Sequence, residues 1–235
     1  MLTPGNRKLG ERLIWGFGLP SGRPDLCVGL SEECFEHCYA RVIERLRPGV
    51  LAFYRRNLHL SRQADFARRV RHFILAHDVS VLRLHVAGDF YDAAYAGKWL
   101  QVMHALPKVR FFFYTRSWRE GPIRAVLERM AGLGNCRAWY SCDRGTGVPA
   151  QVPPQVRLAW LMTTPEDLPP AGVALIFRVR SLRRQARARI NGVRVCPHED
   201  GVARKAPVTC DRCRLCWKPL PEEAPRRFTL PTLNQ

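Results

Sequence analysis

The sequence is poor in acidic residues and has no long apolar run. Lysine and arginine together number 38 against 20 aspartate and glutamate residues, so the formal net charge is +18. No stretch is long and apolar enough to cross a bilayer. The opening residues MLTPGNRKLGERL lack the apolar centre of a secretory signal. We therefore expect a cytoplasmic protein that does not associate with membranes.

The excess of positive charge indicates which kind of molecule the protein binds. A strongly basic surface attracts polyanions, which favours a nucleic-acid or nucleotide substrate. Residues 178–190 hold six arginines in thirteen positions, and such a run could follow a phosphate backbone. The alternative for this segment is a solvated basic face of a helix.

The nine cysteines indicate metal centres more than disulfides, because cytoplasmic thiols stay reduced and an odd total does not pair up. Seven of them form two groups, spaced C-x6-C-x3-C and C-x13-C-x2-C-x2-C: Cys27, Cys34 and Cys38, then Cys196, Cys210, Cys213 and Cys216. Four thiolates close a tetrahedral site or hold an iron–sulfur cluster, whereas three leave one position open for chemistry. Cys136 and Cys142 are interpreted as buried strand residues.

Apolar segments with strand character alternate with helical periodicity along the chain. Strands are expected at 12–20, 81–90, 109–117, 136–141, 155–162 and 173–179, and helices at 31–47, 50–77, 93–106 and 121–132. Ser31 and Asp92 are expected to be the N-cap residues of the first and third of these helices. This order predicts an α/β fold with a parallel sheet, either doubly wound or a partial (β/α)6 TIM-type barrel. We expect a core over 1–190, a cysteine-rich metal module over 191–220 and a flexible tail over 221–235.

Three cysteines follow the first strand, and the last of them precedes Tyr-Ala. The other motifs are the segments RLHVAGDFYDAAYAGKW (83–99) and VRFFFYTRSW (109–118) and the closing CPHEDG…C-DR-C-RL-CW. Together they resemble the phage gene-product-88 family, which shares features with radical S-adenosylmethionine iron–sulfur enzymes. The resemblance covers roughly residues 10–220 and implies a partial barrel and a class of chemistry, without a substrate.

The resemblance implies that Cys27, Cys34 and Cys38 hold a 4Fe-4S cluster with one open iron. That iron would chelate S-adenosyl-L-methionine, and one-electron reduction would release a 5′-deoxyadenosyl radical. Gly88 and Asp89 would meet the amino group of this cofactor. The spacing departs from the usual C-x3-C-x2-C, and zinc is the alternative metal. Cys34 and Cys38 are expected one helical turn apart on one face.

Further candidates come from the expected strand ends. Thr115 is a candidate for cofactor binding, and Arg116 could hold a carboxylate or phosphate. His85 and Ser117 are the other candidate catalytic residues. The competing interpretations are a core histidine for His85 and a surface arginine at the strand exit for Arg116. Ser141 and Asp143, at the end of the fourth strand, are weaker candidates. Asp89 could instead only terminate its strand.

Two functions follow for the chain. The first is a radical S-adenosylmethionine-like enzyme that needs an electron donor and modifies an unknown, possibly nucleic-acid or nucleotide, substrate. The C-terminal cysteines would then hold a second 4Fe-4S cluster or zinc. The alternative is a zinc-stabilised nucleic-acid-binding protein without catalysis.

Overall fold

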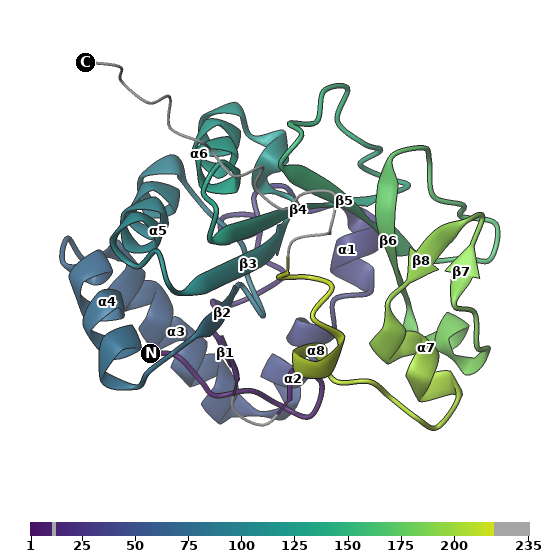
Figure 1. The fold of residues 1–235 in the computed structure, drawn as a ribbon, viewed down its shortest axis with the longest axis horizontal. Helices are drawn as coiled ribbons and strands as arrows, with labels where there is room; N and C mark the ends of the chain where they lie inside the picture. Colours follow the sequence, from purple (N-terminus) through teal and green to yellow (C-terminus); the bar gives the residue numbers. More distant parts are fainter. Residues whose placement is uncertain (11–12, 219–235) are drawn as a thin grey trace, which may run out of the picture.

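The computed structural model describes residues 1–10 and 13–218, and its centre is a single sheet (Figure 1). The strands are β1 Ile14–Gly16, β2 Val81–Leu84, β3 Arg110–Thr115, β4 Cys136–Asp143, β5 Val156–Met162, β6 Val173–Arg178, β7 Arg189–Ile190 and β8 Val193–Val195. Their order is β1-β2-β3-β4-β5-β6-β8-β7, and every neighbouring pair is parallel except β7 and β8. The predicted α/β class with a parallel sheet is therefore confirmed.

The helices lie mostly between consecutive strands, as the alternating pattern predicts. They are α1 Glu32–Glu36, α2 Tyr39–Leu46, α3 Pro48–Arg62, α4 Phe66–Ala76, α5 Ala93–Ala105, α6 Gly121–Ala131, α7 Pro197–Ala203 and α8 Cys210–Cys213. The single helix predicted over 50–77 is wrong, because the chain leaves helical geometry after Arg62 and restarts at Phe66. No helix among the described residues is long and apolar enough to cross a membrane.

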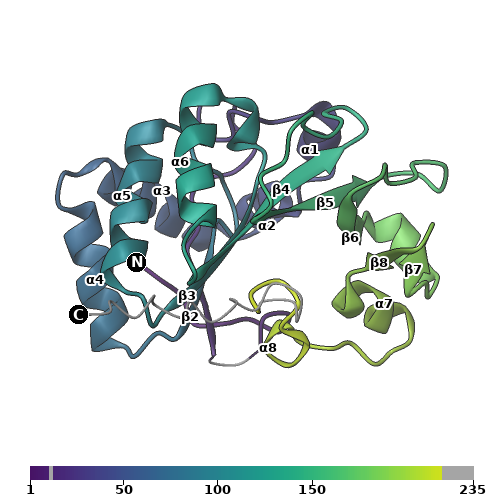
Figure 2. The ribbon, with the colours of Figure 1, turned by 45° about the horizontal axis from the view of Figure 1, so that its top comes forward.

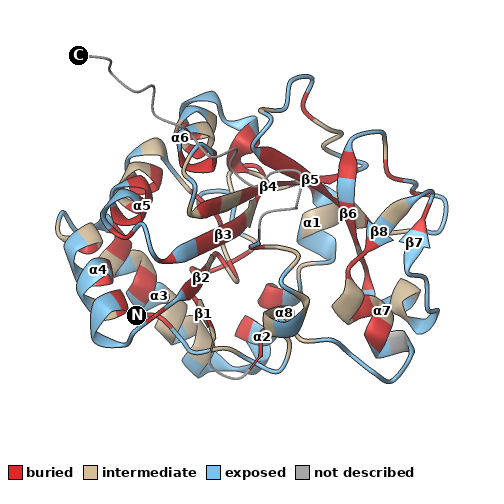
Figure 3. Cartoon of the chain, viewed as in Figure 1, coloured by how far each residue is buried: buried red, intermediate tan, exposed pale blue. Residues whose placement is uncertain are grey.

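The two faces of the sheet are covered by different parts of the chain. On one face α4, α5 and α6 pack in a row, while α8 lies on the opposite face (Figure 2). Because strand side chains alternate, Phe111 and Phe113 of β3 join the core under the helices, and Phe112 joins a second core with Trp217. The central strands are consequently buried on both sides, as the apolar run 109–117 predicts (Figure 3).

The cysteine-rich segment 191–220 belongs to this second face as far as it is described. β8 is a strand of the main sheet, and Trp217 packs against Ile14 and Val81 of the first two strands. The segment therefore completes the core in place of forming a separate body. Residues 219–220 and the tail predicted over 221–235 lie outside the described residues.

Arginine-rich residues 178–190 do not form the helix considered for them. The segment turns through a short 3-10 helix at Arg180–Arg184 and then enters β7. Arg178 is 1% exposed, and the side chain of Arg183 pairs with buried Glu199 at 2.8 Å. A continuous basic helix face is thus absent from this described segment.

Gly88 is required where the chain leaves β2. Its φ is +72°, and a Cβ atom there would lie 2.7 Å from the Cβ atom of Leu19.

We expect Gly88→Ala to lower the free energy of unfolding by about 2–4 kcal/mol, from backbone strain and overpacking. The matched control is Gly97→Ala within α5, where a methyl group meets nothing within 4 Å. That change should stabilise the protein by about 0.5–1 kcal/mol. Equal effects of both changes in denaturant titrations would contradict this account.

Candidate functional site

Cys27, Cys34 and Cys38 line one cavity at the carboxyl ends of the first strands. The cavity encloses about 150 Å³, and its wall includes Gly88, Asp89 and Arg116, together with residues from the loop after β1 and from β2 to β4. Sites in parallel α/β folds form at this end of the strands. The structure thus brings the cysteine triad and four of the other candidate residues to one place, because His85 also lines the cavity.

The chain around Cys34 is fixed by a helix cap. Ser31 is the N-cap of α1, as predicted, and its Oγ accepts a hydrogen bond from the Cys34 amide at 3.1 Å. α1 ends at Glu36, and Cys38 is the N-cap residue of α2. The expectation that Cys34 and Cys38 share one helix face is therefore wrong, because the helix breaks between them.

A second contact anchors α2 to the loop that follows β1. Buried Glu44 accepts hydrogen bonds from the backbone amide of Ser21 at 3.0 Å and from its hydroxyl at 2.7 Å. The hydroxyl of Tyr39 donates to the carbonyl oxygen of Val86. These contacts hold the cysteine-bearing segment against the end of β2.

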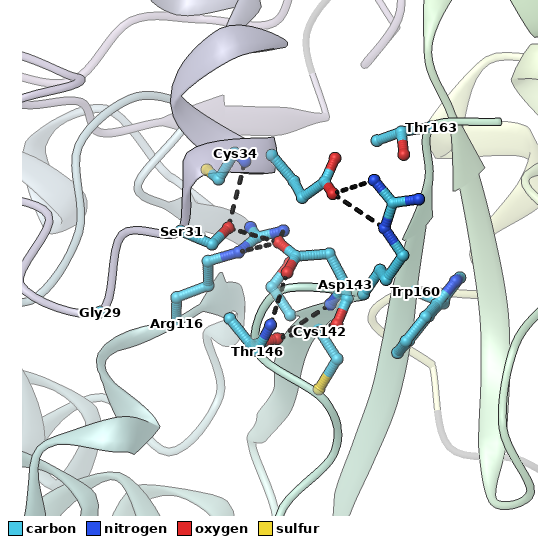
Figure 4. A network of polar contacts seen from close by, with 12 residues as sticks. Gly29, Ser31, Cys34, Arg116, Cys142, Asp143, Thr146, Trp160 and Thr163 are labelled. Atoms are coloured by element: carbon cyan, nitrogen blue, oxygen red, sulfur yellow. Dashed lines mark hydrogen bonds and ion pairs between the residues drawn. The ribbon is translucent and has the colours of Figure 1, made fainter. Parts of the chain in front are cut away.

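Arg116 and Asp143 form a buried ion pair beside the cavity. Figure 4 shows the network: Arg116 Nη2 lies 2.7 Å from Asp143 Oδ2, the same oxygen accepts from Ser31 Oγ at 2.6 Å, and Oδ1 accepts from the Thr146 amide at 2.9 Å. Burial opposes ionisation of Asp143, but Arg116 and these donors outweigh it and lower its pKa. One carboxylate thus positions both the cavity guanidinium and the cap that holds Cys34.

Asp89 connects the ends of β2 and β3. Its carboxylate accepts hydrogen bonds from the Thr115 hydroxyl at 2.6 Å and from the amides of Phe90 and Arg116, both at 2.8 Å. Thr115 is 1% exposed, and its hydroxyl donates its hydrogen bond to Asp89. The structure therefore gives Thr115 a supporting position, while Asp89 itself borders the cavity.

The remaining catalytic candidates, His85 and Ser117, have their polar side-chain groups in the core. The His85 ring lies 4.2 Å from the Phe90 ring, and its Nε2 atom is 2.9 Å from the Tyr95 hydroxyl. Burial lowers its pKa to about 3, so the ring is neutral at physiological pH. Ser117 is fully buried and donates to the Phe90 carbonyl oxygen at 2.8 Å. These placements favour structural functions for both residues.

The C-terminal cysteines gather on the opposite face of the sheet from α4, α5 and α6. Cys210 and Cys216 pack against the cluster that contains Trp217, and Cys196 and Cys216 share the cluster that contains Trp139. Burial raises the pKa of the Cys216 thiol to about 12, and the nearby thiolates of the other three cysteines act in the same direction. The structure thus places Cys196, Cys210 and Cys216 at two neighbouring clusters, with Cys213 at the end of α8.

Neither cysteine group is arranged for a single metal ion. Over residues 1–10 and 13–218, no three Cys, His, Asp or Glu side chains are gathered tightly enough to bind one. A tetrahedral zinc thiolate site needs sulfur–sulfur distances of about 3.8 Å. An iron–sulfur cluster accepts wider spacing, because its own atoms separate the thiolates. Metal binding therefore stays a prediction for both groups.

Sequence reasoning did not identify two residues of this region. Arg83 and Tyr114 line the cavity and are inward-facing residues of neighbouring strands. The alternation of side chains along a strand could have identified them. Arg83 stands two positions before the candidate His85, and Tyr114 stands two positions before the candidate Arg116. Asp143 was a minor candidate, and its pairing with Ser31 spans 112 positions.

Comparison with known proteins identifies the family. The family model described as "Gene product 88" matches residues 1–219. The chain belongs to the gene product 88 family. The predicted family is thus confirmed, while the predicted radical chemistry is not addressed by the match.

Two curated relatives come from mycobacteriophages. Each is named "Gene 88 protein", one from Mycobacterium phage L5 and one from Mycobacterium phage D29, and each is 29% identical over 150 residues. The matched region is 59% of this chain and 60% of each relative. The chain therefore aligns with less than two thirds of either relative. No solved structure matches this gene product 88 protein.

The Arg116–Asp143 pair should matter more to stability than an exposed pair. Its side chains are 11% and 0% exposed, and removing one partner of a buried pair costs about 3 kcal/mol. We expect Asp143→Asn to lower the free energy of unfolding by about this amount near neutral pH. Because the pKa of Asp143 is lower in the folded protein, its ionised form stabilises the fold at pH values above the ordinary aspartate pKa of 3.8. That contribution is lost as the pH falls through the folded value, so the difference between the two proteins should shrink in acid.

The control for this prediction is Glu33→Gln. Glu33 pairs with Arg144 at 2.8 Å, but Arg144 is 62% exposed, so the loss should be about 0–1 kcal/mol. Denaturant titrations from acid to neutral pH would measure both variants. A pH-independent difference for Asp143→Asn would contradict the assignment.

Proposed function

We propose that this protein is a radical S-adenosylmethionine-like iron–sulfur enzyme built on a partial (β/α)6-type barrel. The observation that carries the proposal is the shared cavity, in which Cys27, Cys34 and Cys38 meet Asp89 and Arg116 at the carboxyl ends of parallel strands. The sequential order β1 to β6 is what a partial barrel requires.

The residues at the cavity fit a 4Fe-4S cluster with one open position. Three thiolates are soft ligands suited to iron–sulfur ligation, and all three line one cavity. When bound, the cluster would supply the electron that cleaves the sulfonium of S-adenosyl-L-methionine to a 5′-deoxyadenosyl radical. Low-potential reduction would come from a separate electron donor.

The other groups in the cavity suit the amino-acid end of that cofactor. Arg116 presents a guanidinium that Asp143 holds in place, and a guanidinium binds a carboxylate in bidentate fashion. Asp89 offers a carboxylate for the ammonium group, and Gly88 lets a ligand approach the backbone. Burial raises the pKa of the Cys34 thiol, and the positive charge of Arg116 offsets part of that rise.

The basic surface favours a nucleic-acid or nucleotide substrate for this enzyme. The net charge of +18 would attract such a polyanion to the cavity. The same charge fits the alternative, a zinc-stabilised nucleic-acid-binding protein in the cytoplasm. The open triad at a strand end is the feature that the alternative does not explain.

Protein purified without oxygen tests this proposal. We expect a brown protein whose absorption near 400 nm, on the order of values usual for such clusters, falls in Cys34→Ala. The same variant should lose reductive cleavage of S-adenosyl-L-methionine. The matched control is Cys142→Ala, which removes a buried thiol that does not line the cavity. A colourless wild-type protein that contains stoichiometric zinc would overturn the proposal.

A further inference from the structure

The C-terminal cysteines adjoin the strands whose carboxyl ends form the cavity, and Tyr114 of β3 contacts both. Trp217 and Cys216 pack against β1, β2 and β3, whose carboxyl ends bear the cavity. In Figure 2, α8 lies across these strands on the side away from α5 and α6. The second cysteine group therefore packs on the strands that bear the candidate site.

Backbone and side-chain hydrogen bonds fix this position. The Cys210 amide donates to the Lys8 carbonyl oxygen at 2.9 Å, and the Cys196 amide donates to the Ile176 carbonyl oxygen at 2.9 Å. The Trp139 indole nitrogen donates to the Cys216 carbonyl oxygen at 3.0 Å. Three separate parts of the chain thus hold the cysteine segment on the sheet.

Tyr114 and Arg83 stand between the two cysteine groups. Both residues line the cavity. The Tyr114 hydroxyl donates a hydrogen bond to Cys216 Sγ at 2.8 Å, and the Arg83 guanidinium lies 5.8 Å from the centre of the Tyr114 ring. A single layer of side chains therefore separates the cavity from the C-terminal group.

The positively charged side chains near the C-terminal cysteines would be stabilised by a negatively charged group. Arg83 Nε is buried without a hydrogen-bond partner, and in the described part of the chain no carboxylate pairs with Arg83. The partly exposed Lys8, whose carbonyl oxygen accepts from the Cys210 amide, likewise has no carboxylate partner among the described residues, and its ammonium lies 5.4 Å from the centre of the Phe177 ring. An isolated buried cation is costly. Four thiolates around a 4Fe-4S core carry a net charge of about −2, which these two cations would balance.

We propose that Cys196, Cys210, Cys213 and Cys216 hold a second, fully ligated 4Fe-4S cluster, to which Tyr114 donates a hydrogen bond through Cys216. Binding would release the four thiol protons to solvent. Cys196, Cys210 and Cys216 pack at the neighbouring Trp217 and Trp139 clusters, and Cys213 ends the same short helix that Cys210 begins. Thiolates grouped in this way suit iron–sulfur ligation. The inference is independent of the function proposed for the cavity.

Metal analysis of the full chain, prepared without oxygen, tests the site. We expect about eight irons and eight sulfides per chain and no zinc. Cys213→Ser should remove about half of the iron, and Cys34→Ala should remove the other half. If the wild type instead holds about four irons that only Cys213→Ser removes, the cavity proposal fails and this inference stands. Zinc that Cys213→Ser removes, or full iron retention in that variant, would overturn the inference. So would a wild-type chain whose iron only Cys34→Ala removes.

Tyr114→Phe tests the positioning function without removing a ligand. We expect the iron content to stay unchanged and the reduction potential of the Cys213-dependent cluster to fall, because a donor to the thiolate stabilises the reduced form. The control is Tyr140→Phe, whose buried hydroxyl has no hydrogen-bond partner among the described residues and belongs to the core beneath the helices. That variant should leave the potential unchanged. An unaltered potential in Tyr114→Phe would remove Tyr114 from the proposal.

Discussion

The structure depends on one constraint: a parallel sheet must bury both of its faces. Helices α4, α5 and α6 cover one face, as they do in other α/β folds. The opposite face is covered by the chain's own C-terminal segment, which inserts Trp217 against Ile14 and Val81. The strands whose carboxyl ends carry the candidate residues are held in place by the packing on both of these faces.

That constraint explains which parts of the structure the sequence predicts well. The apolar run of β3 and the caps Ser31 and Asp92 depend on neighbouring residues, and the structure contains all three. The break between α3 and α4 escaped prediction, because Gln63-Ala64-Asp65 contains neither glycine nor proline. Local pattern alone thus locates most elements and misses a boundary that packing decides.

The candidate site shows the same division between local and long-range information. The convergence of Cys27, Cys34 and Cys38 follows from their short spacing and their position after β1. The contribution of Asp143 depends on Ser31, which is 112 positions away, and the hydrogen bond from Tyr114 to Cys216 spans 102. Such contacts are set by strand order and register, which single-sequence patterns do not specify. The interpretation of His85 as a site residue was open for the same reason, since only the fold shows its ring among Phe17, Phe90 and Tyr95.

The position of Trp217 also affects how the chain can be made. Synthesis proceeds from the N-terminus, so β1, β2 and β3 leave the ribosome long before residue 217 does. Until then Ile14, Val81 and Phe112 present an uncovered apolar surface, and such surfaces on partly folded chains promote aggregation. Trp217 can therefore cover this surface only late in synthesis, and a chain cut short before Trp217 would leave it exposed to solvent.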